Sequence, residues 1–329
     1  MAEIVVGVAA SHSPQLSSGV EWWENHGERD RNNPKLLGRD GEWHTYDELL
    51  ATSDAKVLDE LTPEIFQDKY ERTQRAIAVL TEKLAEAKPD VVVVIGDDQW
   101  EMFKDEGIPA FALYHGDGLF DENQRDLSNL PAGIQAAAWA AHVGDERSWH
   151  TTDGKLGAHI TKTLSENDFD VHWFKEQRED RTLGHAFTFP RYRLGLDTSI
   201  PIVPLFINCY FPPNNPNPAR CFAFGQAVRE AIESWDADVR VAVITSGGLS
   251  HFVVNEALDQ QVIGGLLAGD WDSFGDIERK HMRSGSAEIL NWIAAAGILE
   301  KQTATLVDYV PGYRSPAGTG TGMAFAYWK

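Results

Sequence analysis

The sequence has few cysteines and no long apolar run. Its 329 residues include two cysteines, Cys209 and Cys221, which do not form a CxxC pair. Such usage is typical of a reduced, cytoplasmic compartment. No apolar run approaches the roughly 20 residues that a membrane-spanning helix needs. The short apolar stretch at residues 4–8 has no basic residues before it, which indicates a first β-strand rather than a signal peptide.

Basic residues are fewer than acidic residues. There are 29 Lys and Arg residues against 50 Asp and Glu residues, which gives a formal net charge of −21 spread along the chain. Binding to nucleic acid depends on the neutralisation of phosphates by Lys and Arg, so this balance argues against a nucleic-acid partner. It argues equally against an anionic membrane surface. A small-molecule partner is therefore the expectation.

Apolar runs that alternate with helical patterns predict the fold class. Strands are expected at residues 4–8, 90–95, 108–113, 169–174, 200–206 and 239–245. Helices are expected after Thr62, which precedes Pro63 as an N-cap, and at residues 219–235, 255–267 and 286–296. Strands separated by helices favour a single α/β domain over residues 1–329, with a mostly parallel central sheet and helices on both faces. Residues 17–42 and 208–218 are irregular and predict loops, and residues 310–321 carry several Gly and Pro residues before a last aromatic strand.

Polar side chains follow three of the predicted strands. His12 follows the first strand, Asp97 and Asp98 follow the valine-rich strand, and His251 follows Gly247 and Gly248 after a late strand. Ligands of open α/β sheets gather at the carboxyl ends of the strands. Each residue also has a structural interpretation, as a hydrogen-bonded histidine, a turn or helix-capping aspartate, or a solvated imidazole. The pattern predicts a polar site and no particular reaction.

Glu288 comes from a different part of the pattern, because it lies near the start of a predicted helix after Ser284-Gly285-Ser286. On the pattern alone, an exposed acid that interacts favourably with the helix dipole is the better interpretation.

Several motifs, taken in order, resemble one known family. They are SHSP at 11–14, DVVVVIGDDQWEMF at 90–103, GH at 184–185 followed by Pro190, Asn208 with Pro212-Pro213 and RCFA at 220–223, GGLSH at 247–251, and SGS at 284–286 with Glu288 and Trp292. This series resembles the class III extradiol ring-cleavage dioxygenases, in particular the catalytic β subunit of the protocatechuate 4,5-dioxygenases. Residues from about 22 to 75 do not fit the series and look like an insertion with helices.

The resemblance implies a non-haem Fe(II) site of the two-histidine, one-carboxylate type, with open positions for a catecholic substrate and O₂. His12 and Glu288 would be metal ligands. His251 would be the base that takes a proton from a substrate hydroxyl, a role that suits a histidine titrating near neutral pH. His185 would be a second acid/base or substrate-positioning group, or else a structural histidine.

One position departs from the family pattern, because Gln99 stands where the second histidine ligand is expected. Gln99 could coordinate weakly through its amide oxygen, although imidazole is the preferred ligand of iron. Asp97 or Asp98 could replace it and form a site with one histidine and two carboxylates, which could prefer another divalent metal. His44, from the inserted segment, could also complete the set. A fourth outcome is loss of catalysis.

Three functions follow from these alternatives. The leading hypothesis is cleavage of a protocatechuate- or gallate-like aromatic with Fe(II) and O₂. The second is a hydrolase or lyase that uses a divalent metal as Lewis acid and His251 as base. The third is a non-catalytic subunit that has lost its metal. A homodimer is expected, and the inserted segment could supply what a small partner subunit supplies elsewhere in the family.

Overall fold

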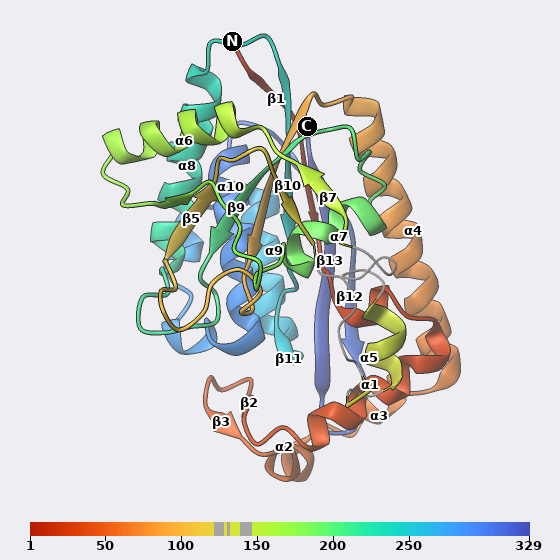
Figure 1. The fold of residues 1–329 in the computed structure, drawn as a ribbon. Coiled ribbons are helices and arrows are strands. Elements are labelled where there is room, and N and C mark those ends of the chain that lie inside the picture. Colours follow the sequence, from red (N-terminus) through yellow and green to blue (C-terminus); the bar gives the residue numbers. More distant parts are fainter. Residues whose placement is uncertain (122–127, 130–131, 139–146) are drawn as a thin grey trace.

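A twisted sheet runs through the molecule and carries helices on both faces (Figure 1). The computed structural model describes residues 1–121, 128–129, 132–138 and 147–329. Within these ranges the main sheet has nine strands, in the order β11-β13-β1-β10-β4-β9-β5-β8 with β12 paired to β13. The strands are β1 Glu3–Ala10, β4 Val91–Asp97, β5 Phe111–Tyr114, β8 His172–Phe174, β9 Ile202–Ile207, β10 Arg240–Ser246, β11 His251–Val253, β12 Ala304–Tyr313 and β13 Thr319–Trp328.

The centre of the sheet is parallel, as predicted, and its flanks are not. β1, β10, β4 and β9 pair in parallel, whereas β13 runs antiparallel to β1, β11 and β12, and β5 runs antiparallel to β9. The long helices are α4 Pro63–Ala87, α6 Gly154–Glu166, α7 His185–Arg193, α8 Pro218–Ser234, α9 Glu256–Ala268 and α10 Ile289–Leu299. The predicted α/β class with helices on both faces is confirmed. None of the described helices is both long and apolar enough to cross a membrane.

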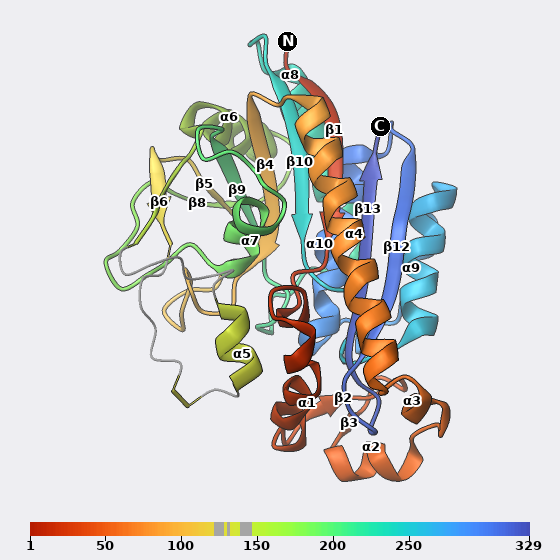
Figure 2. The same ribbon diagram turned by 90° about the vertical axis from the view of Figure 1, so that its right-hand side faces the viewer.

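The valine-rich strand β4 shows how the sequence produces two hydrophobic layers. Val92 and Val94 pack with residues of α4 and α7, such as Leu80. Val91 and Val93 point to the opposite face, where they join residues of α6, α8 and α10. Successive side chains of a strand point to opposite faces, so a continuous apolar run indicates a strand that is covered on both sides. Figure 2 shows α4 crossing the first of these faces.

The start of α4 agrees with its sequence signal. The Thr62 side chain accepts a hydrogen bond from the Ile65 backbone N–H, and Pro63 occupies the first turn. This N-cap satisfies one of the amide groups that a helix start leaves without a partner.

Residues 17–42 were predicted as a loop, and this prediction is wrong. The segment contains helix α1 Trp23–Arg31 and strand β2 Leu36–Leu37, which pairs with β3 Trp43–His44. Trp23 is fully buried, and its ring lies 5.8 Å from that of Phe66 and 6.3 Å from that of Tyr70. Packing against α4 therefore stabilises a helix whose own polar composition gives little helical signal.

Residues 310–321 carry several Gly and Pro residues, and β12 and β13 continue through part of this segment. Gly320 lies opposite Tyr313 in the register, and a Cβ on Gly320 would lie 2.1 Å from the backbone oxygen of Gly312. Glycine at this position allows the two strands to approach closely. The glycines of this segment belong to a tight hairpin, and the aromatic strand expected after them is β13.

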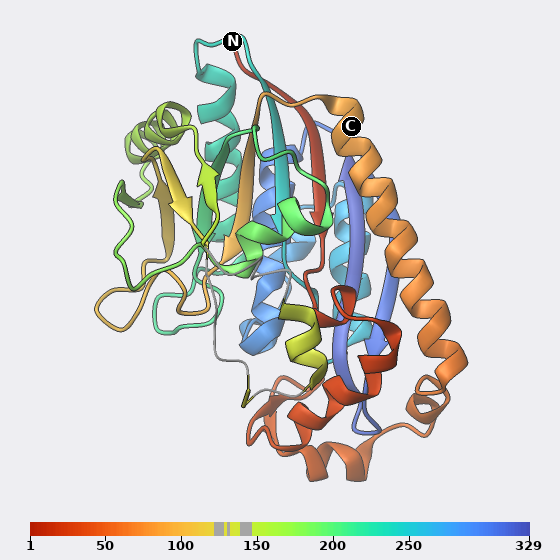
Figure 3. The ribbon, with the colours of Figure 1, turned by 45° about the vertical axis from the view of Figure 1, so that its right-hand side comes forward.

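The remaining short elements lie mainly at the edges of the molecule. They are α2 Tyr46–Thr52, α3 Lys56–Asp59, α5 Ala132–Ala137, β6 Gly118–Phe120 and β7 Trp149–Thr151. Figure 3 shows α1, α2, α3 and α5 together beyond the carboxyl ends of β1, β4 and β10. The helical segments near the N-terminus thus cover the edge of the sheet where polar residues were predicted to gather.

Candidate metal centre

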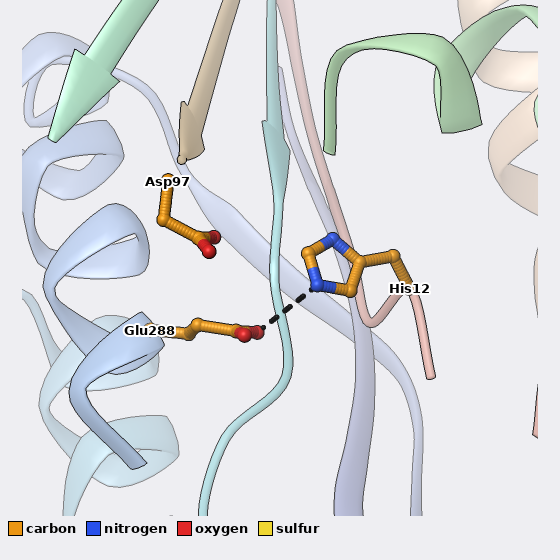
Figure 4. A group of neighbouring side chains, drawn as sticks. All are labelled: His12, Asp97 and Glu288. Atoms are coloured by element: carbon orange, nitrogen blue, oxygen red, sulfur yellow. Dashed lines mark ion pairs between the residues drawn. The ribbon is translucent and has the colours of Figure 1, made fainter. Parts of the chain in front are cut away.

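Three side chains from distant parts of the chain meet at this edge of the sheet. His12 follows β1, Asp97 ends β4 and Glu288 immediately precedes α10 (Figure 4). One potential ligand atom from each lies within 4.8 Å of the others, and all three side chains are buried. His12 Nε2 is 3.2 Å from Glu288 Oε2. The fold therefore brings His12 and Glu288 together with Asp97, one of the residues predicted as an alternative to Gln99.

His12 is oriented through its second ring nitrogen. Its Nδ1 shares a 3.0 Å hydrogen bond with the hydroxyl of Ser246, the last residue of β10. Because β1 and β10 are parallel neighbours, their carboxyl ends bring these two residues together. A hydrogen bond at one ring nitrogen fixes the other toward a metal, which is the usual arrangement for histidine ligands.

Glu288 has several hydrogen-bonding neighbours. The backbone N–H of Gly248 donates to Oε2 at 2.7 Å, and the Tyr210 hydroxyl donates to Oε1 at 2.6 Å. Burial opposes ionisation of this carboxyl, but nearby His251 and His12 lower its pKa well below the ordinary value. Glu288 is therefore an anion in a site with little access to water.

Asp97 is held between two amide groups. Asn291 Nδ2 donates to Oδ1 at 3.1 Å, and Gln99 Nε2 donates to Oδ2 at 3.3 Å. Burial, with a contribution from the nearby Glu288 carboxylate, raises the pKa of Asp97 to about 7. Two buried carboxylates this close repel each other, and a divalent cation between them would relieve the repulsion. One imidazole and two carboxylates form a donor set that fits a divalent first-row transition metal.

The other candidate ligands lie as follows. Gln99 enters the site, but its amide nitrogen faces the carboxylates, at 3.4 Å from Glu288 Oε1. The carboxylate of Asp98 turns away and accepts hydrogen bonds from the backbone N–H groups of residues 100, 102 and 103. His44 lies in β3, where its ring nitrogen is 3.0 Å from Asp40. The structure brings Gln99 to the centre and does not bring Asp98 or His44 there.

His251, the predicted base, lies beside the carboxylate cluster. Its Nδ1 donates to the Leu249 carbonyl at 2.8 Å, which leaves Nε2 facing Glu288 Oε1 at 3.2 Å. Burial opposes the charged form of His251, but Glu288 outweighs this and raises its pKa.

His185, the first residue of α7, lies on another side of His12, with 4.6 Å between the two ring centroids. Its Nδ1 is 2.7 Å from the Glu101 carboxylate. Burial opposes the charged form of His185, but Glu101 outweighs this and raises its pKa to about 9. His185 is therefore charged at neutral pH.

Sequence reasoning did not identify Tyr210 or Glu101. Besides its bond to Glu288, the Tyr210 hydroxyl lies 3.3 Å from His251 Nε2. Glu101 is the carboxylate that keeps His185 charged. Both residues lie inside segments that carry the family resemblance. Glu101 comes two positions after Gln99, and Tyr210 comes two positions after Asn208. Neither residue belongs to a pattern with a known chemical role.

The cluster opens into a cavity of about 120 Å³. Its walls include His12, Gln99, His185, Tyr210, His251, Phe252 and Glu288, together with His26, Arg29, Ile134 and Arg314 from the segments beyond the sheet edge. A cavity of about 150 Å³ accepts benzene in another protein, so this space is on the scale of one aromatic ring.

The fold and the site define an α/β protein with a buried histidine–carboxylate cluster facing a cavity the size of one ring. Residues 57–324 match the family described as "Catalytic LigB subunit of aromatic ring-opening dioxygenase". The match covers most of the chain, and the chain belongs to this family. The predicted relation to class III extradiol dioxygenases is thereby confirmed. His12 lies outside the matched range.

Curated relatives resemble part of the chain. The gallate dioxygenase of Pseudomonas putida is 30% identical over 185 residues, covering 50% of this chain and 50% of that protein. A 2,3-dihydroxyphenylpropionate/2,3-dihydroxicinnamic acid 1,2-dioxygenase of Comamonas testosteroni is 25% identical over 177 residues, covering 54% of this chain and 48% of that protein. The enzyme of the same name from Mycobacterium ulcerans is 29% identical over 185 residues, covering 56% of this chain and 50% of that protein. The chain thus spans about half the length of these relatives.

Proposed function

We propose that this chain opens the ring of a catecholic aromatic compound, of the protocatechuate or gallate type, by extradiol cleavage with Fe(II) and O₂. The observation that carries the proposal is the buried cluster of His12, Asp97 and Glu288 at the wall of a one-ring cavity. Family membership and the names of the relatives support the same reaction class.

In this proposal His12, Asp97 and Glu288 hold the metal, and Gln99 hydrogen-bonds the two carboxylates. A divalent iron bound there supplies Lewis acidity toward the ring hydroxyls and the redox chemistry that activates O₂. The cavity walls hold the ring and exclude water from the reacting atoms.

The surrounding histidines move protons. His251 donates its Nδ1 proton to the Leu249 carbonyl, so Nε2 is the atom that takes a proton from a substrate hydroxyl. The Tyr210 hydroxyl lies beside that nitrogen and orients the imidazole. His185, charged through its contact with Glu101, is the proton donor on the other side of His12.

The test is to purify the protein anaerobically, add Fe(II), and follow O₂ uptake with a panel of catechols. The proposal predicts uptake stoichiometric with substrate and a coloured ring-fission product. His251→Gln is expected to lower kcat by about 100-fold or more while metal binding persists, because it removes a general base. Absence of O₂ uptake from the iron-loaded protein with every catechol would contradict the proposal.

A second function is favoured by one observation, which is that Gln99 stands where the family pattern has an imidazole while Asp97 joins His12 and Glu288 in the cluster. A centre with two carboxylates and one histidine also suits Mn²⁺ and metal-assisted hydrolysis or elimination. Stoichiometric metal binding without any O₂ consumption would support this alternative. Absence of metal above background would instead support a non-catalytic subunit.

A further inference from the structure

One part of the cavity wall does not come from the central sheet. His26 and Arg29 lie in α1, and Arg314 lies between β12 and β13. All three line the same cavity as the metal cluster. The proposed chemistry uses none of them, yet they place two guanidinium groups next to a space for one ring in a chain with a net charge of −21.

Phe252 connects these arginines to the reacting end of the cavity. The guanidinium carbon of Arg29 lies 5.9 Å from the centre of the Phe252 ring, and that of Arg314 lies 5.8 Å from it. The same ring is 5.4 Å from the imidazole of His251. The Phe252 ring therefore neighbours both the Arg29 guanidinium and the predicted base.

Arg314 has a structural partner. Its guanidinium donates to both carboxylate oxygens of Asp30, at 2.7 and 3.0 Å, and both side chains are buried. This bidentate pair ties α1 to the β12–β13 hairpin and fixes the helix that carries Arg29. Arg29 is an exposed residue that also lines the cavity.

His26 supplies a second, independent observation. It is 1% exposed, and its Nε2 shares a 2.8 Å hydrogen bond with the Ser18 hydroxyl. Its Nδ1 is buried and has no hydrogen-bond partner among the described residues. Burial, with the nearby Arg314, lowers the pKa of His26 to about 3, so the ring is neutral. A buried polar atom without a partner is costly, and a ligand in the cavity would satisfy it.

We infer that Arg29 and His26 form the recognition site for the carboxylate of an aromatic acid whose ring hydroxyls face the metal cluster. This inference rests on the proposed function and assigns the residues that recognise the carboxylate of such a substrate. A guanidinium matches a carboxylate in charge and in its paired donors. His26 gives one further polar contact without adding charge. The segment predicted as an insertion thus selects the substrate while the sheet carries the chemistry.

The experiment compares acids with analogues that lack only the carboxylate. Gallate is paired with pyrogallol, and 3-(2,3-dihydroxyphenyl)propionate with 3-ethylcatechol. Binding to the anaerobic iron-loaded protein is measured by calorimetry, and O₂ uptake is measured separately. Arg29→Met is expected to raise the Kd of the preferred acid by about 10- to 100-fold, the range of a charge-assisted hydrogen bond, and to leave that of its uncharged analogue within about twofold.

Arg31→Met is the matched control. Arg31 is in the same helix and is also exposed, but its guanidinium lies over the Tyr46 ring and does not line the cavity. Removing it changes the net charge equally and is expected to leave all four affinities unchanged. Equal losses in the two variants, or equal losses for acid and analogue in Arg29→Met, would overturn the inference.

The two readouts separate this inference from the proposed function. Preferential binding of the acids that depends on Arg29, without O₂ uptake, would uphold the carboxylate site and overturn the dioxygenase proposal. O₂ uptake with the same kcat/KM for acids and analogues, unaffected by Arg29→Met, would uphold the proposed function and overturn the carboxylate site.

Discussion

The metal cluster and the α1 wall of the cavity are built in different ways. The cluster is formed by residues at the ends of parallel strands and at the start of a buried helix, and each side chain is held by hydrogen bonds from neighbouring elements. The α1 wall is held by one buried ion pair and by Trp23. The comparison indicates that the two regions have different roles. The sheet positions the residues proposed to bind the metal, and the separately anchored helix α1 carries the residues proposed to recognise the substrate.

The largest expected effect is on the cluster side. Glu288→Gln keeps the shape of the side chain but removes the charge, so metal binding should be lost and kcat/KM should fall by about 1,000-fold or more. Metal content by mass spectrometry and O₂ uptake are the measurements, with circular dichroism as a check of folding. A Glu288→Gln protein that retains one metal per chain would show that the cluster is not the metal site.

The next effect is on the anchoring of α1. Asp30→Ala leaves the Arg314 guanidinium buried without its partner, which should lower the free energy of unfolding by about 3–5 kcal/mol. Urea unfolding measures the change.

The matched comparison is Asp308→Ala, because Asp308 pairs with Arg72 at a half-exposed position. That variant should lose about 1 kcal/mol or less. Similar losses in the two variants would mean that the buried pair does not anchor α1.

A smaller effect, on metal affinity, distinguishes Asp97 from Gln99 as the third ligand. Asp97→Asn should weaken metal binding by about 10- to 100-fold, because it removes a charged donor from the cluster. Gln99→Ala should weaken it less, since the glutamine contacts the carboxylates through its amide nitrogen. Competition with a metal-binding dye gives both affinities. A larger loss in Gln99→Ala would assign the third position to Gln99.

The smallest effect concerns Asp259, which supports the loop that carries His251. This carboxylate accepts hydrogen bonds from the backbone N–H and hydroxyl of Ser250 and from the Tyr309 hydroxyl. Burial raises its pKa to about 6 from an ordinary value of 3.8. The unfolded chain therefore releases this proton at lower pH, and the contribution of Asp259 to stability is lost as the pH rises toward and through 6.

Between about pH 4.5 and pH 7 this loss should amount to about 2 kcal/mol. Asp259→Asn should remove that part of the pH dependence, as measured by urea unfolding at the two pH values. An unchanged pH dependence in the variant would show that Asp259 titrates normally in the folded protein.

The parts of this molecule that could be predicted from sequence are those where a local pattern reports a local structure. The valine run of β4 and the Thr62-Pro63 cap of α4 each indicated an element that the structure contains. Helix α1 could not be predicted in this way, because its burial depends on contacts between Trp23 and residues more than 40 positions away.

The site shows the same limit. The pattern predicted polar residues at the strand end formed by residues 97–99, but it could not say which of their side chains enters the cluster. The choice of side chain depends on the turn after β4. In this turn Asp98 accepts hydrogen bonds from backbone N–H groups, whereas Asp97 and Gln99 face Glu288. Tyr210 reaches Glu288 from a separate loop, and no spacing in the sequence relates the two residues.

The most direct test of the account is to locate the metal. Anomalous scattering at the iron edge, from crystals of the anaerobic protein loaded with Fe(II), gives the position of the ion without reference to activity. The account predicts one peak bound by His12 Nε2, Glu288 and Asp97, beside His251. A peak at any other place in the chain, or an ion bound without His12 and Glu288, would contradict it.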